Sequence, residues 1–113
     1  MTAYDIIKLG LSHVYDTPVT DVEAKKFSLD VLQTLVVECF ESEQNSRDVE
    51  DATIPNVTNQ NIVIPYNDYL CRVCLPYGVA WKYAEANNLP TAAYYQNLYE
   101  DARHIAGGAK WVE

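Results

Sequence analysis

The residues of this chain that could do chemistry are its three cysteines and two histidines. Cys71 and Cys74 form a C-x-x-C pair, a spacing that occurs in redox motifs and in zinc sites. A redox pair needs a helix start in a βαβ context, where the helix dipole lowers the thiol pKa, and no such alternation surrounds these residues. A zinc site needs two more ligands, but only Cys39 is at hand, since His13 and His104 have no ligand spacing. We predict core cysteines, with a metal site and a redox site as alternatives.

The other polar side chains form no catalytic pattern. His13 stands off the apolar stripe of its segment, and His104 lies near the end of a predicted helix, where a cation is favourable. Six carboxylates lack the D-x-D-x-D-G spacing of a calcium loop and predict a solvated acidic face. The sequence therefore predicts no enzymatic activity, no cofactor and no metal. The six carboxylates are Glu38, Glu41, Glu43, Asp48, Glu50 and Asp51.

The charge balance bears on the class of partner. The net charge is −8, and residues 1–51 carry 11 acidic and 4 basic side chains. Phosphate binding needs clustered Lys and Arg, so we predict no specific nucleic-acid binding, although an acidic surface suits DNA that must slide past it. We expect no membrane span, because no apolar run reaches about 18 residues. The absence of a signal-peptide pattern and the odd number of cysteines predict a protein made in the cytosol.

The spacing of apolar residues predicts an all-α fold, a small bundle of about four helices in one domain over residues 1–113. Two capping boxes mark the first two helices, since Thr2 is followed by Asp5 and Thr20 by Glu23. The predicted helices cover about residues 3–15, 20–44, 67–87 and 90–106, and a flexible tail covers about 107–113.

Residues 52–65 interrupt the helical pattern and predict a short β-hairpin or an extended arm between the second and third helices. Ile54 and Ile62–Ile64 are β-prone, and a turn-prone stretch separates them. Pro55 and Pro65 limit any hydrogen-bonded ladder. Because an isolated hairpin is marginal in water, the arm should lie on the helices or pair with another chain.

Pro76 falls inside the third predicted helix, which Asn67 or Asp68 should cap. Pro76 removes one backbone hydrogen bond and should kink that helix, or else a short separate turn precedes it. The short connection at Asn87–Pro90 predicts that the last two helices are antiparallel neighbours. The predicted apolar face of the last helix comprises Ala92, Tyr95, Leu98, Tyr99, Ala102 and Ile105.

Aromatic residues near the C-terminus are the clearest interaction candidates. Tyr95 points with the apolar stripe, so its neighbour Tyr94 should be exposed, and Trp111 lies in a polar tail. Tyr and Trp dominate interface hot spots. Packing of Trp111 against its own bundle is the alternative. The full set of interface candidates, including those in the arm, is Ile54, Val57, Ile62, Tyr94, Lys110, Trp111 and Val112.

The order of these segments resembles that of the small head–tail connector, or adaptor, proteins of tailed bacteriophages. The resemblance covers most of the chain and consists of hydrophobic patterns with modest landmarks. In the first half it lies in Ile6–Tyr15, Pro18 and Val22–Phe40. In the second half it lies in the entry Ile62, Ile64, Pro65, Tyr69 and Leu70, and in the closing segments 80–86 and 92–106. The cysteine pair, Pro76 and the short tail depart from the family pattern.

This resemblance implies a structural role. Connector proteins form a ring, commonly of twelve copies, between the portal of the filled capsid and the next neck or tail protein. It implies subunit contacts through the arm at 52–64 and the last two helices, closed by head-to-tail packing. It also implies that the tail at 109–113 reaches the portal and that the acidic loop at 41–51 borders the DNA channel. The protein would then occupy the virion neck, after assembly in the bacterial cytoplasm.

Two other classes remain open from the sequence. A small helical interaction module of bacterial regulatory type would be a stable monomer or dimer without a link to virion genes. A small metal- or thiol-dependent enzyme would hold zinc or a reactive thiol at Cys71 or Cys74.

Overall fold

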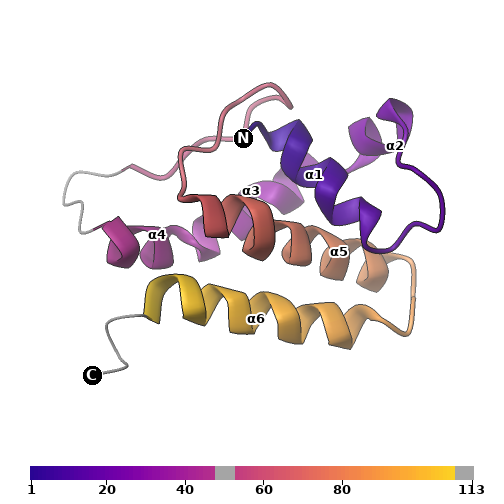
Figure 1. The fold of residues 1–113 in the computed structure, drawn as a ribbon. Helices are drawn as coiled ribbons and strands as arrows, with labels where there is room; N and C mark the ends of the chain where they lie inside the picture. Colours follow the sequence, from indigo (N-terminus) through magenta and orange to yellow (C-terminus); the bar gives the residue numbers. More distant parts are fainter. Residues whose placement is uncertain (48–52, 109–113) are drawn as a thin grey trace.

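Side chains cap the starts of the first three helices in the computed structural model, whose ribbon is drawn in Figure 1. The structure describes residues 1–47 and 53–108, and within these ranges it contains helices and no β-strand, so the all-α prediction is confirmed. The elements are α1 (Ala3–Ser12), α2 (Asp21–Lys26), α3 (Leu29–Glu38), α4 (Phe40–Arg47), the π-helical turn η1 (Leu70–Cys74), α5 (Leu75–Ala86) and α6 (Ala92–Gly108).

The predicted long helix over residues 20–44 is wrong, because the chain breaks it twice. Thr20 caps α2 as expected, but Phe27 and Ser28 are extended, with ψ angles of 135° and 124°. The Ser28 hydroxyl accepts a hydrogen bond from the Val31 amide at 3.3 Å and so caps a new helix, α3. A second turn at Cys39 separates α3 from α4. The described residues therefore form six α-helices where about four were predicted.

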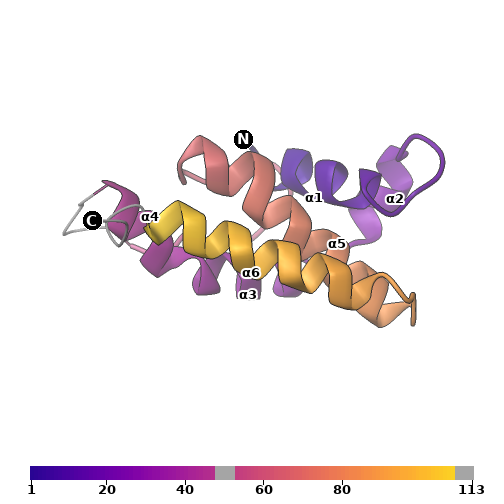
Figure 2. The same ribbon diagram turned by 60° about the horizontal axis from the view of Figure 1, so that its bottom comes forward.

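Helix α5 is the centre of the molecule. It contacts α1, α3 and α6, and Figures 1 and 2 show α1 on one side of it and α6 on the other. Glycine permits the closest of these approaches. A Cβ at Gly10 of α1 would lie 2.4 Å from the Val79 Cβ and 2.7 Å from the Pro76 carbonyl oxygen. Packing therefore requires a glycine at position 10, because the α1–α5 contact is too tight for any side chain there.

The disturbance expected at Pro76 takes the form of the π-helical turn before it. Asn67 caps this segment, since its side-chain oxygen accepts a hydrogen bond from the Leu70 amide at 3.0 Å. The Leu75 amide then bonds to the Leu70 carbonyl, an i→i−5 pattern that widens the helix where proline cannot donate. The chain continues as α5, and Asn87 caps the C-terminal end of this helix. The next residue, Asn88, adopts a left-handed φ of 56°.

The segment between α4 and η1 is an extended arm, and the β-hairpin alternative is not formed within the described residues. Its last residues pair instead with the N-terminus: the Ile64 amide bonds to the Met1 carbonyl at 2.9 Å, and the Ala3 amide to the Ile62 carbonyl at 2.8 Å. Gln33 of α3 holds the other end, donating to the Pro55 carbonyl at 3.0 Å and accepting from the Val57 amide at 2.6 Å. As predicted, the arm lies on the helices.

No helix within residues 1–47 and 53–108 combines the length and the apolar character needed to cross a membrane.

Candidate interaction surfaces

The cysteines belong to the core, as predicted, but the C-x-x-C residues do not face each other. All three thiols are buried and free. Cys74 lies 3.8 Å from Cys39, sulfur to sulfur, whereas Cys71 lies against the carbonyl oxygens of Ile64 and Tyr66 at 3.5 and 3.6 Å. The hydrogen bond with Cys39, together with burial, raises the pKa of the Cys74 thiol. Burial also raises the pKa of Cys71, so both side chains stay protonated and poorly nucleophilic.

Tyr99 of α6 completes this cluster and links it to the surface. Its ring is fully buried beside Trp81, at 5.6 Å between ring centroids. Its hydroxyl donates to Glu38 Oε1 at 2.7 Å and lies 3.5 Å from the Cys39 sulfur. Burial raises the pKa of Tyr99. The described residues leave no buried side-chain nitrogen or oxygen without a hydrogen bond, so the cluster is a satisfied part of the core.

The histidines and carboxylates that the structure describes come together in no metal site. Within the described ranges, no group of three or more His, Cys, Asp or Glu side chains could hold an ion. His13 lies beside Tyr77 and Tyr95, at 5.0 and 6.0 Å between ring centroids, and burial lowers its pKa. His104 lines a small polar hollow with Glu38, Glu41 and Arg103.

Glu43 contradicts the prediction of a uniformly solvated acidic face. It is only 6% exposed, and its Oε1 accepts hydrogen bonds from the backbone amide of Asn67 at 2.6 Å and from the Asn67 side chain at 3.2 Å. This carboxylate therefore ties α4 to the start of η1. Asp48, Glu50 and Asp51 lie outside the described residues.

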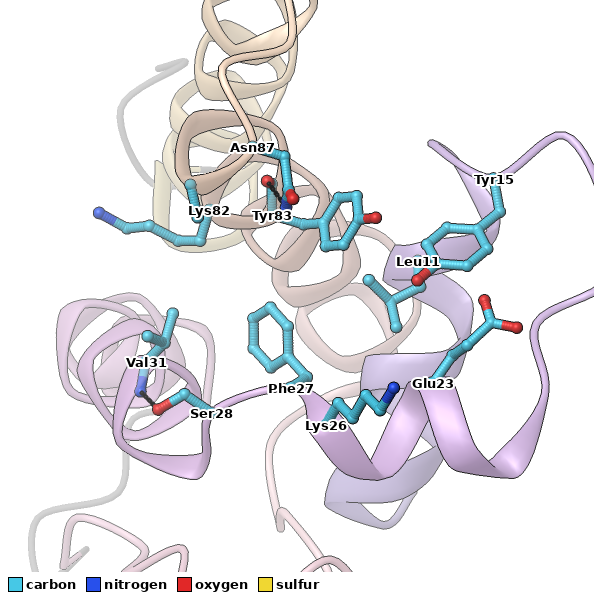
Figure 3. Close-up of a pocket in the computed structure, with 11 residues that line it drawn as sticks. Leu11, Tyr15, Glu23, Lys26, Phe27, Ser28, Val31, Lys82, Tyr83 and Asn87 are labelled. Atoms are coloured by element: carbon cyan, nitrogen blue, oxygen red, sulfur yellow. Dashed lines mark hydrogen bonds between the residues drawn. The ribbon is translucent and has the colours of Figure 1, made fainter.

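One apolar pocket opens between the end of α1, helix α2, the start of α3 and the end of α5. Figure 3 shows its lining, with Phe27 near the middle, Leu11 and Tyr83 beyond it, and Tyr15 and Glu23 at one rim. Its volume is about 370 Å³, within the range of pockets that take a ligand or a side-chain anchor. The residues that line it are Leu11, Tyr15, Glu23, Lys26, Phe27, Ser28, Val31, Lys82, Tyr83, Ala86 and Asn87.

Polar groups of this pocket cluster at its rim. The hydrogen bond with Tyr83, together with burial, raises the pKa of Tyr15 to about 12, and the two rings lie 5.4 Å apart between centroids. The ammonium of Lys82 lies 3.9 Å from the Trp81 ring centroid, so it is the aliphatic stem of Lys82 that lines the pocket. Lys26 and Glu23 stand on α2 at the mouth. The pocket thus offers an apolar floor and charges of both signs.

The predicted interface residues lie in different environments. Tyr94 is 60% exposed on α6, and Ile54 is 44% exposed in the arm. Ile62 is half-buried, and Val57 is buried in the chain's own core, so Val57 offers no surface to a partner. The remaining three candidates, Lys110, Trp111 and Val112, lie outside the described residues.

Other exposed apolar side chains escaped the sequence analysis. Ile105 was expected on the apolar face of the last helix, but it is 62% exposed. It lies eleven residues after Tyr94, which is close to three full helical turns, so these two residues share an outer face of α6. That spacing was the signal available in the sequence. Val22 of α2, Val37 of α3 and Val63 of the arm are also exposed, and no pattern marked them.

Comparisons of the chain with protein-family models, with curated proteins and with solved structures found no match.

Proposed function

We propose that this protein is a structural assembly protein of a tailed phage or prophage, a head–tail connector that forms a ring of identical subunits between the portal and the next neck or tail protein. The proposal starts from the resemblance of the segment order to that family. The chemistry of the described residues is consistent with it, because their cysteines and Tyr99 are taken up by packing.

The observation that carries the proposal is the placement of exposed apolar side chains on two sides of α5. Val22 and Val63 belong to α2 and the arm, on the side of α1, while Tyr94 and Ile105 belong to α6 on the other side (Figure 1). Scattered apolar residues are ordinary on a surface. Head-to-tail packing of identical copies, however, requires contact residues on opposite sides of the subunit, and a ring closes where the rotation allows.

The acidic character of the chain supports the same role. A net charge of −8 disfavours tight binding to DNA, because like charges repel. A neck protein must let DNA pass without holding it. The packing of the arm onto α3 and the N-terminus also leaves a preformed surface for a neighbouring copy, so little chain ordering is needed on assembly.

The test is to express this chain with the portal protein encoded in the same genome and to image the purified complex by electron microscopy. We expect an added ring below the portal. Tyr94→Asp should abolish the ring, because it places a charge in the apolar contact on α6. Gln96→Glu adds the same charge at another exposed position of that helix, about 200° around the helix axis from Tyr94, and should leave the ring intact.

A chain that stays monomeric or dimeric, binds no portal and lies among metabolic or regulatory genes would overturn the proposal. That result would favour the alternative of a small helical interaction module. The unfolding temperature of each variant, followed by circular dichroism, checks that any loss of assembly does not come from loss of folding.

A further inference from the structure

The apolar pocket bounded by α1, α2, α3 and α5 lies at the opposite end of the molecule from the point where α6 ends. The last residues of α5, Ala86 and Asn87, line the pocket, and α6 runs back antiparallel to α5 (Figures 1 and 2). The 17 residues of α6 span about 24 Å. Gly108 therefore stands about 24 Å, measured along α6, from the end of α5 that borders the pocket.

The residues after Gly108 are too few to bring Trp111 into the pocket of the same chain. Three residues extend the backbone by at most about 11 Å, less than half of that separation. The hollow nearest to Gly108 is lined mainly by polar side chains, among them Glu38, Glu41, Arg103 and His104, so it offers an indole few apolar partners. Neither of these two hollows of its own chain therefore offers Trp111 an apolar site within reach.

The chemistry of the tail matches the pocket of a neighbouring copy. Trp111 supplies a large apolar ring with one hydrogen-bond donor, and the pocket supplies an apolar floor of Leu11, Phe27 and Val31. The tail places Lys110 before the tryptophan and Glu113 after it. The mouth of the pocket carries Glu23 and Lys26, so both ends of the segment find an opposite charge.

We infer that Trp111 of one copy binds in the pocket between α1, α2, α3 and α5 of the next copy, and that this contact joins subunits head to tail. The inference rests on the proposed function for its partner, a second copy of this chain. It assigns the tail to a neighbouring subunit in place of the portal that the family resemblance implies. Because the pocket and the end of α6 lie at opposite ends of the molecule, each copy can both give and receive one tail.

The experiment measures binding of a labelled peptide with the sequence of residues 106–113, amidated at its end, by fluorescence anisotropy. The receptor is the full chain carrying Trp111→Ala, which leaves its own pocket vacant. We expect saturable binding, at least tenfold weaker for the peptide with Trp111→Ala. Binding of the unaltered peptide should also be at least tenfold weaker when the receptor carries Ala86→Trp in addition. Ala86 is exposed at the pocket, so the new indole ring fills the pocket.

A second receptor variant keeps the test informative if Ala86→Trp disturbs folding. Lys26→Glu, on the exposed face of α2, reverses the charge at the mouth and should weaken binding several-fold, more at low salt than at high salt. The inference is overturned if the peptide does not bind, or if it binds equally well to the receptor with a filled pocket.

The proposed function is tested by a separate measurement, the formation of a ring on the portal in electron microscopy. If the chain that carries only Ala86→Trp fails to bind the peptide but still forms a ring on the portal, the tail contact is overturned. The connector role then stands. Specific peptide binding by a chain that forms no ring and binds no portal would support the contact and overturn the connector role.

Discussion

The two ends of α5 differ in how completely they are packed. At its first half, Gly10 and Gly78 let neighbouring elements approach until an added methyl group would overlap them, and Tyr99 closes the space with a satisfied hydroxyl. At its last turn, Tyr83 and Ala86 border an open pocket of about 370 Å³. The same kinds of apolar and aromatic residues line both ends.

This difference indicates which end is committed to the fold and which is available to a partner. Close packing with satisfied polar groups is what holds a small core together. An apolar pocket left open at the surface costs stability unless something fills it. The following substitutions test the contrast, from the largest expected effect to the smallest.

Gly10→Ala should produce the largest loss of stability. The added methyl group would lie 2.4 Å from the Val79 Cβ and 2.7 Å from a backbone oxygen, so α1 must move away from α5. Overpacking of this kind costs about 3 kcal/mol in the free energy of unfolding. Urea denaturation followed by circular dichroism measures it. Ser12→Ala, at an exposed position of the same helix, is the control and should change stability by less than about 0.5 kcal/mol.

Tyr99→Phe and Tyr95→Phe remove the same atom from two positions of α6. The Tyr99 hydroxyl, on a fully buried ring, donates to the exposed carboxylate of Glu38 in a partly buried hydrogen bond, whereas the Tyr95 hydroxyl donates to the exposed His13 carbonyl at 2.8 Å. Loss of the partly buried bond, which has a charged acceptor, should cost about 1–2 kcal/mol. Water can replace the exposed one, so Tyr95→Phe should cost about 0.5 kcal/mol or less. Equal losses in chemical denaturation would contradict this difference between the two hydroxyl groups.

Ala86→Trp should leave stability within about 0.5 kcal/mol of the parent chain, although it adds far more atoms than Gly10→Ala does. Ala86 is exposed and faces the open pocket, so the indole meets space instead of backbone. A shift in thermal unfolding temperature provides the measurement. Destabilisation as large as that of Gly10→Ala would mean that the pocket is closed in solution.

His13 should give the smallest effect, confined to acidic pH. Burial lowers its pKa below the usual 6.5, so as the pH falls the unfolded chain takes up this proton before the folded chain does. Stability is therefore lost as the pH falls from about 7 to the folded-state pKa. In His13→Asn that loss should be absent. Proton NMR of the His13 ring should place its midpoint below about 6.5 in the folded chain and near that value in urea; a higher midpoint in the folded chain would refute this.

The parts of the fold that sequence could predict are those that depend on local patterns. The capping box at Thr2 and Asp5 and the cap at Asn67 are found where expected, because a cap is decided within three residues. The burial of the cysteines was also predictable, since apolar neighbours surround them in the helical pattern.

The predictions that were wrong concern features that depend on contacts between distant segments or on competing local signals. The apolar spacing of residues 20–44 runs smoothly through Ser28, and only its cap on α3 reveals the break. The burial of Glu43 requires Asn67, which lies 24 residues away. The pocket is assembled from four elements, and no single segment carries its signature. Whether α6 buries or exposes Ile105 likewise depends on where its neighbours stand.

The pairing of the first residues with the arm bears on how the chain folds during synthesis. Met1 and Ala3 take their backbone partners from Ile64 and Ile62, and Gly10 takes its packing partner from Val79. Contacts so distant in sequence form late and slow the search for the native state. Helix α1 leaves the ribosome before α5 and must therefore wait, with Ile6 and Ile7 unburied, until α5 has emerged to receive it.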